Sequence, residues 1–198
     1  MSHYFKEDKQ LEHDVRKKEY IINDVKLEML TDRGVFSKER LDFGTHVLLK
    51  NIEVKEHIKT IVDMGCGYGP IGLYLAKTYP DLNVYMYDVN ERAVNLAKDN
   101  KKLNHISNAH IDVSNLFDNC DINADLIVTN PPIRAGKQTV FKLYEQAYEH
   151  LNKGGHFYCV IQKKQGAPST FNKLLELFSN CEVLDKEKGY WILLSIKQ

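Results

Sequence analysis

Short apolar runs alternate with longer segments of helical periodicity along most of the chain. The runs are four to six residues long, which is typical of buried strands, and they cover residues 60–63, 83–88, 109–112, 126–129 and 156–161. Apolar residues at helical spacing lie between and after them, at about 70–79, 91–103, 139–151 and 169–179. Strands and helices that alternate at these lengths predict a parallel sheet with helices on both faces.

The two ends of the chain depart from this alternation. Within residues 20–29, apolar positions alternate with polar ones on both sides of an Asn-Asp turn, which predicts a β-hairpin. Residues 181–187 and 190–196 form two strand-like segments around a Lys-Gly turn, so at least one strand should run antiparallel. The predicted fold class is therefore α/β, a Rossmann-like doubly wound sheet with an N-terminal β-hairpin extension.

Length and composition are those of one globular domain. With 198 residues, 43% apolar and 27% charged, the chain can bury one core, and its composition excludes a disordered protein. Residues 1–17 carry charges of both signs and are interpreted as a mobile arm ahead of a single domain at 18–198. The N-terminus lacks a signal-peptide core and no apolar run approaches membrane-spanning length, which predicts a cytoplasmic protein without a membrane partner.

Charge and cysteine content bear on the partners and metal sites that the protein could have. The formal net charge is zero, which implies no global attraction to nucleic acid, yet residues 133–175 hold seven bases against two acids. A monomer is expected, with a weak dimer as the alternative. No Cys-x-x-Cys pair occurs, so reduced thiols and no metal site are predicted for Cys66, Cys120, Cys159 and Cys181.

A glycine-rich loop follows the first run of the alternating region. The segment DMGCGYGP at 63–70 carries Gly65, Gly67 and Gly69 and opens a helix, at the edge where doubly wound sheets bind ligands. Asp63, just before the glycines, would oppose a pyrophosphate at the helix N-terminus. A cofactor with an amine, a sulfonium and no phosphate suits that acid better, and S-adenosylmethionine is such a cofactor.

The next two strands end in polar residues that suit a nucleoside. Asp88 ends the second strand, where an acid can accept both hydroxyls of a ribose, in NAD as well as in S-adenosylmethionine. After the third strand, Asn115 could meet the exocyclic amine of adenine while Leu116 lies against the ring. An ordinary polar turn is the alternative interpretation there.

The segment TNPPIRAGK at 129–137 follows the fourth strand and predicts chemistry on a planar amine. Prolines cannot donate to a sheet ladder, so they end the strand. The side chain of Asn130 and the backbone carbonyl of Pro131 offer two acceptors for one NH₂ group, and the prolines hold both in place. Such orientation favours in-line methyl transfer without a strong base. The alternative is a strand end followed by a turn.

Cations follow this segment and the fifth strand. Arg134 and Lys137 come after the prolines, and Lys163 and Lys164 follow residues 156–161, so a parallel sheet brings all four to one edge. Such a rim suits a phosphate backbone, with Gln162 and Gln165 available to read a base edge. Ordinary solvated lysines are the alternative.

Four segments together resemble a known family. GVFSKERLDFG (34–44), DMGCGYGPIG (63–72), NPPIRAGK (130–137) and VIQKKQGAP (160–168) are similar to the "small domain" ribosomal RNA guanine-N2 methyltransferases, a group of class I S-adenosylmethionine-dependent enzymes. The resemblance covers residues 20–196. It implies the strand order 3-2-1-4-5-7-6 with the last strand antiparallel, the target amine at Asn130 and Pro131, and the segment around Phe36 over the methionine end of the cofactor.

The chain departs from this family at three points. Many members have an acid where this chain has Asn115, and an aromatic residue that stacks on the base where it has Ile133. Well-known members also carry a second, N-terminal copy of the domain that helps to hold RNA, and 198 residues leave no room for one.

The first functional hypothesis is methylation of the N2 amine of a guanine in small-subunit ribosomal RNA. The alternatives are a protein glutamine amide or adenine N6 as acceptor, or an RNA-binding assembly module with weak catalysis. An NAD-linked oxidoreductase is disfavoured by Asp63. The predicted catalytic residues are Asn130, Pro131 and Pro132. The predicted cofactor contacts are Phe36, Asp63, Gly65, Gly67, Gly69, Asp88, Val89, Asn115 and Leu116. The predicted RNA contacts are Ile133, Arg134, Lys137, Gln162, Lys163 and Lys164.

Overall fold

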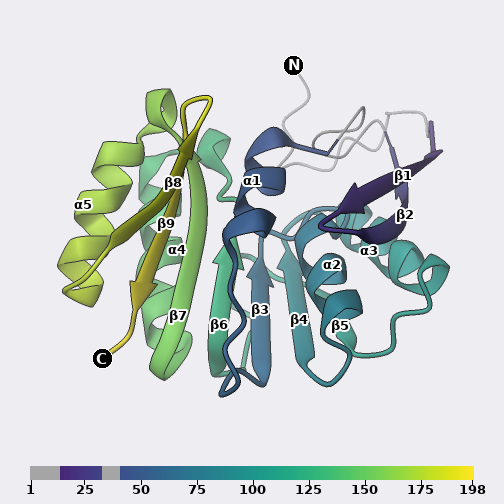
Figure 1. Ribbon diagram of the computed structural model, residues 1–198, viewed down its shortest axis with the longest axis horizontal. Coiled ribbons are helices and arrows are strands. Elements are labelled where there is room, and N and C mark those ends of the chain that lie inside the picture. Colours follow the sequence, from purple (N-terminus) through teal and green to yellow (C-terminus); the bar gives the residue numbers. More distant parts are fainter. Residues whose placement is uncertain (1–13, 33–40) are drawn as a thin grey trace.

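A seven-stranded sheet forms the centre of the molecule (Figure 1). The computed structural model describes residues 14–32 and 41–198. The order β5-β4-β3-β6-β7-β9-β8 is the predicted 3-2-1-4-5-7-6, and β9 runs antiparallel to both of its neighbours, β7 and β8, so the predicted fold class is confirmed. The strands are β3 Thr60–Met64, β4 Asn83–Asp88, β5 Ala109–Val113, β6 Ala124–Thr129, β7 Leu151–Gln162, β8 Glu182–Glu187 and β9 Tyr190–Ile196.

Helices cover both faces of this sheet and bury two apolar clusters. The helices α1 Phe43–Asn51, α2 Pro70–Thr78 and α3 Glu91–Leu103 lie on one face, and α4 Lys137–His150 and α5 Ala167–Phe178 lie on the other. In β7, Tyr158 and Val160 pack into the first cluster while Phe157 and Cys159 pack into the second. Because side chains alternate between two buried faces, the strands read as continuous apolar runs.

The predicted N-terminal hairpin is a separate two-stranded sheet made of β1 Arg16–Ile22 and β2 Val25–Thr31. Asn23 and Asp24 both have positive φ, as a tight hairpin turn requires. Strand β1 includes two residues of the segment interpreted as an arm. Residues 1–13 and 33–40 lie outside the described part of the chain, and so does the prediction made for Phe36.

Asn100 joins this hairpin to the rest of the domain. Its fully buried side chain exchanges two hydrogen bonds with the backbone of Leu30, at 2.6 and 3.0 Å, as a neighbouring strand would. The same amide nitrogen donates to the carbonyl of Tyr68 at 2.9 Å. The edge of β2 is thereby held against α3 and the glycine loop.

Strand β7 is twice as long as predicted. The helical pattern suggested residues up to 151, whereas α4 ends at His150 and β7 begins at the next residue. The first part of the strand contains Gly154 and Gly155, which give no apolar alternation, and its register with β6 is irregular there; Gly154 N donates to Lys197 O at 2.7 Å and joins this part to the end of the chain. The described residues contain no helix long and apolar enough to cross a membrane.

Candidate active site

The glycine loop between β3 and α2 is built from left-handed backbone conformations. Gly65, Gly67 and Gly69 have φ values of 78°, 57° and 99°, which glycine adopts without steric cost. The backbone N–H groups of Gly65 and Cys66 donate to Tyr87 O at 2.8 and 2.9 Å, so the loop is fixed against the end of β4. A Cβ on Gly65 would meet no atom within 4 Å, which leaves this side of the loop open to a ligand.

Asp63 is fully buried beneath this loop and only half satisfied. Its Oδ2 accepts the backbone N–H of Gly72 at 2.8 Å, while its Oδ1 has no hydrogen-bond partner. Burial raises the pKa of Asp63 to about 7, and the nearby charge of Asp88 adds to the rise, while the Gly72 N–H opposes it. An unsatisfied buried oxygen of this kind costs about 1–3 kcal/mol or more. A ligand amine could donate the missing hydrogen bond to Oδ1, and the methionine end of S-adenosylmethionine carries such an amine.

Asp88 at the end of β4 is also buried. Its Oδ2 accepts the N–H of Gly67 at 2.8 Å and its Oδ1 accepts the N–H of Asn90 at 2.9 Å. An ionised carboxylate has about four acceptor sites, so a group of this kind is suited to accept the hydroxyls of a ribose. The carboxyl group is therefore oriented by the loop itself before a ligand arrives.

Apolar side chains are exposed next to Asp88. Val89 is 40% and Val113 39% exposed, at the carboxyl ends of β4 and β5. Leu116 is half-buried and takes a positive φ of 52°. A planar ring placed here would cover apolar surface, as the adenine of the predicted cofactor requires.

Asn115 lies in the same turn, and its amide direction is set by a neighbouring acid. Its Nδ2 donates to Asp118 Oδ2 at 2.8 Å. Because a carboxylate only accepts hydrogen bonds, the carbonyl oxygen of Asn115 must face away from Asp118. That oxygen can accept from an exocyclic amine, which is the role predicted for this position.

The two prolines after β6 form a rigid turn. Pro132 has φ −76° and ψ 76°, the geometry of an inverse γ-turn, in which Ile133 N donates to Pro131 O at 2.9 Å. A carbonyl has two lone pairs, so Pro131 O keeps one for a substrate. Thr129 Oγ1 donates to Met64 O at 2.7 Å and ties this turn to the start of the glycine loop.

Asn130 presents one defined side of its amide. Its Nδ2 donates to Asp42 Oδ2 and to Thr45 Oγ1, both at 3.0 Å, so both amide hydrogens have acceptors. The carbonyl oxygen is left for another donor. Asp42 and Thr45 were not predicted from the sequence. The available signal was the Asp-x-x-Thr spacing at the start of α1, where Asp42 caps the helix by accepting the N–H of Thr45 at 2.9 Å.

The predicted cations are exposed, in two groups at the carboxyl edge. Arg134 belongs to a short 3₁₀ turn (Ile133–Ala135) and Lys137 begins α4, while Lys163 and Lys164 lie in a second 3₁₀ turn after β7. Gln162, the last residue of β7, is half-buried, and Gln165 is exposed.

The turn between β8 and β9 adds a cation that was not predicted to bind RNA. Lys163 N donates to Gly189 O at 2.7 Å, which brings Lys188 to the same edge. The Nζ of Lys188 lies 4.5 Å from the centre of the Phe43 ring, next to Asp42. Ile133 differs from these cations because it is half-buried and packs against the apolar cluster under α4.

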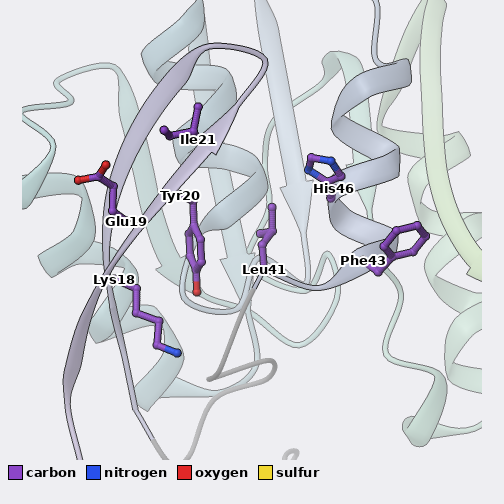
Figure 2. A pocket seen from close by; sticks show the side chains of 7 residues that line it. All are labelled: Lys18, Glu19, Tyr20, Ile21, Leu41, Phe43 and His46. Carbon is purple, nitrogen blue, oxygen red and sulfur yellow. The ribbon is translucent and has the colours of Figure 1, made fainter.

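A cavity of about 480 Å³ lies between β1 and the start of α1 (Figure 2). Residues 18–21 line one side, and Leu41, Phe43 and His46 line the other. Among the predicted cofactor residues that the structure describes, none lines this cavity. Two of the lining residues, Leu41 and Phe43, flank Asp42, whose carboxylate accepts a hydrogen bond from Asn130.

The chain matches a family and several known proteins. The methyltransferase small domain family matches residues 26–194. The uncharacterized protein YbxB of Bacillus subtilis is 44% identical over 193 residues, which is 96% of each chain. Ribosomal RNA large subunit methyltransferase G of Shewanella amazonensis is 29% identical over 174 residues, and the match spans 83% of this chain but only 44% of that relative.

A solved structure shares the fold of this chain. The 16S rRNA N2 methyltransferase of T. thermophilus, in complex with AdoMet and guanosine, superposes with a TM-score of 0.82 at 23% identity, over 93% of this chain and 51% of that one. The family match and the identity to YbxB show that the chain belongs to the methyltransferase small domain family and is an S-adenosylmethionine-dependent methyltransferase.

Proposed function

We propose that this enzyme methylates the exocyclic N2 amine of a guanine in small-subunit ribosomal RNA. The observation that carries the proposal is the arrangement of acceptors after β6. The amide hydrogens of Asn130 are taken by Asp42 and Thr45, and its carbonyl oxygen lies one residue before the carbonyl of Pro131, which has one free lone pair. Two rigid acceptors suit the two N–H groups of one planar amine.

The chain's own residues would act by orientation. The lone pair of a guanine amine is delocalised into the ring, which makes the nitrogen a poor nucleophile. Accepting both of its N–H groups draws the nitrogen toward tetrahedral geometry and fixes the direction of its lone pair. Orientation of this kind contributes on the order of 7–11 kcal/mol in favourable cases. S-adenosylmethionine, when bound, supplies the methyl group as a sulfonium.

The exposed cations support RNA as the acceptor. Arg134, Lys137, Lys163, Lys164 and Lys188 lie at the carboxyl edge, where phosphates would be met before a base reaches Asn130. Two of the similar proteins are named as ribosomal RNA methyltransferases, one of the large subunit and one of 16S RNA. The complex of the second with guanosine favours guanine and the small subunit. Such a substrate would be met in the cytoplasm.

The acceptor pair also favours a second candidate. A glutamine amide or the N6 amine of adenine presents the same planar NH₂ group, and nothing in the pair itself selects guanine. The basic edge favours RNA over a protein acceptor. Many family members have an aromatic residue at position 133 that stacks on the base, whereas Ile133 packs against the apolar cluster under α4. Weaker stacking would favour a third candidate, an RNA-binding assembly module with weak catalysis.

Transfer of a tritiated methyl group tests the choice between acceptors. The enzyme is incubated with labelled S-adenosylmethionine and, separately, with naked 16S RNA, naked 23S RNA, free ribosomal subunits and ribosomal proteins. Nucleoside digestion should place the label in N2-methylguanosine from 16S RNA or small subunits, and Asn130→Ala should lose it. Label in glutamine, in N6-methyladenosine or in large-subunit RNA would contradict the proposal.

A further inference from the structure

A carboxylate from a distant part of the chain contacts the proposed catalytic amide. Asp42 and Asn130 are 88 residues apart, and Asp42 Oδ2 accepts Asn130 Nδ2–H at 3.0 Å. The same oxygen accepts the backbone N–H of Thr45 at 2.9 Å as the N-cap of α1. Asp42 is therefore held by the helix that it caps, and it holds Asn130 in turn.

The chemistry of the two partners decides which way this amide faces. A terminal amide can turn by half a rotation and exchange its carbonyl oxygen with its NH₂ group. The hydroxyl of Thr45 is compatible with both orientations, since a hydroxyl donates or accepts. A carboxylate only accepts, so Asp42 alone excludes the orientation in which Asn130 would turn its NH₂ group toward a substrate amine.

We infer that Asp42 is a positioning residue for methyl transfer, which fixes the carbonyl oxygen of Asn130 toward the target amine and polarises it. The inference rests on the proposed function of Asn130. A charge-assisted hydrogen bond to the NH₂ side of an amide increases the negative charge on its oxygen, which strengthens the bond that this oxygen accepts.

Packing around Gly44 keeps the carboxylate in place. A Cβ on Gly44 would lie 2.8 Å from the ring of Tyr190 and 3.1 Å from Asp42 Oδ2, so the backbone here approaches both groups as closely as glycine allows. Asp42 is therefore packed between α1, Asn130 and the start of β9.

Two substitutions at Asp42 separate orientation from helix capping. Asp42→Ser keeps a good N-cap side chain but offers Asn130 a hydroxyl, which no longer excludes the reversed amide. In Asp42→Asn, the N–H of Thr45 can only donate, so it selects the oxygen of the new amide, and that oxygen still accepts from Asn130. Asparagine therefore keeps the orientation and loses the charge.

Asp125 provides a matched control at the opposite edge of the sheet. Its Oδ2 accepts the N–H groups of Lys59 and Thr60 at 2.9 and 3.0 Å, and its Oδ1 accepts Asn152 Nδ2–H at 2.8 Å. Asp125→Ser thus removes a carboxylate with the same kinds of partner as Asp42, but far from Asn130.

Steady-state methyl transfer gives the first readout. Asp42→Ser should lower kcat at least about tenfold, with the KM for RNA and the affinity for S-adenosylmethionine within about twofold of the wild type. Asp42→Asn should recover most of the loss, and Asp125→Ser should leave kcat unchanged. A wild-type kcat in Asp42→Ser, or equal losses in the two serine variants, would overturn the inference.

The NMR signal of the Asn130 side-chain NH₂ group gives a second readout without any acceptor substrate. The signal is identified by its disappearance in Asn130→Ala. One of its protons should be shifted downfield and exchange slowly in the wild type and in Asp42→Asn, and both features should be lost in Asp42→Ser. An unchanged signal in Asp42→Ser would overturn the inference. If the signal behaves as expected while the wild type fails to methylate RNA, only the proposed function fails.

Discussion

Asp63 accepts a hydrogen bond from the backbone N–H of Gly72 at 2.8 Å through one oxygen, while its other oxygen is buried without a partner. The pKa of this carboxyl is raised from 3.8 to about 7, chiefly by burial. In the folded protein Asp63 therefore keeps its proton up to about pH 7, whereas in the unfolded chain it loses the proton near pH 4. The stability that the protonated carboxyl contributes is therefore fully present below about pH 4 and is lost as the pH rises through 7.

This relationship predicts a pH dependence of cofactor binding. A cationic amine pairs with ionised Asp63, and the ionised fraction rises about fivefold between pH 6 and pH 7 for a pKa near 7. The affinity for S-adenosylmethionine should rise by about that factor, with release of a proton from the protein. Calorimetry in two buffers of different ionisation enthalpy measures both. Asp63→Asn is the control, and equal affinities of the wild type at pH 6 and pH 7 would refute the amine contact.

Asn130→Ala should separate turnover from cofactor binding. Removing one of the two rigid acceptors is expected to lower kcat by about a hundredfold or more, by analogy with the loss of one preorganised hydrogen-bonding group. The affinity for S-adenosylmethionine should stay within about twofold. Asn152→Ala is the matched control, since Asn152 also donates its amide to a carboxylate, at the opposite edge. Turnover that is equal in the two variants would remove Asn130 from the mechanism.

Two glycines with similar backbone strain test the open face of the glycine loop. Gly65 and Gly154 have φ values of 78° and 77°, and a Cβ at either would meet no atom within 4 Å. Each change to alanine should therefore lower the free energy of unfolding by about 1–2 kcal/mol through backbone strain alone. Only Gly65→Ala should also weaken binding of S-adenosylmethionine, because its methyl group enters the space of the ligand. Chemical denaturation and calorimetry give the two quantities, and equal cofactor affinities would place the ligand elsewhere.

The basic edge should be visible in the salt dependence of RNA binding. The double variant Lys163→Glu, Lys164→Glu removes two phosphate contacts, which should weaken binding and reduce the slope of log K against log salt by about 1.4–1.8. Lys101→Glu with Lys102→Glu is the control, since these residues lie at the C-terminal end of α3, away from the carboxyl edge. A slope unchanged by the first pair, or reduced equally by both pairs, would contradict RNA contact at this edge.

Much of the fold could be predicted from the chain because its signals are local. The strands of the sheet are buried on both faces, so each appears as an apolar run, and the Asn-Asp turn specifies the N-terminal hairpin. The backbone conformations after β3 and after β6 are ones that glycine and proline adopt far more readily than other residues, so these residue types mark the two loops in the sequence. Asn100 shows the limit, because an asparagine in a helix gives no sign that it replaces a strand partner for β2.

The parts of the candidate site that could not be predicted depend on tertiary packing. Asp42 reaches Asn130 because α1 packs beside β7 and β9, and no periodicity of the sequence encodes that contact. Lys188 joins the basic edge because β8 and β9 form a hairpin whose turn bonds to Lys163. Many family members have an acid at the position of Asn115. In this chain Asp118, three residues later, supplies a carboxylate that accepts from Asn115 and orients its amide.

The most direct test of the central claim is nucleoside analysis of 16S ribosomal RNA from cells that lack this protein. The account predicts that one N2-methylguanosine is missing, that wild-type protein restores it, and that Asn130→Ala, present at the same level, does not. An unchanged content of N2-methylguanosine in the deletion strain would contradict the claim.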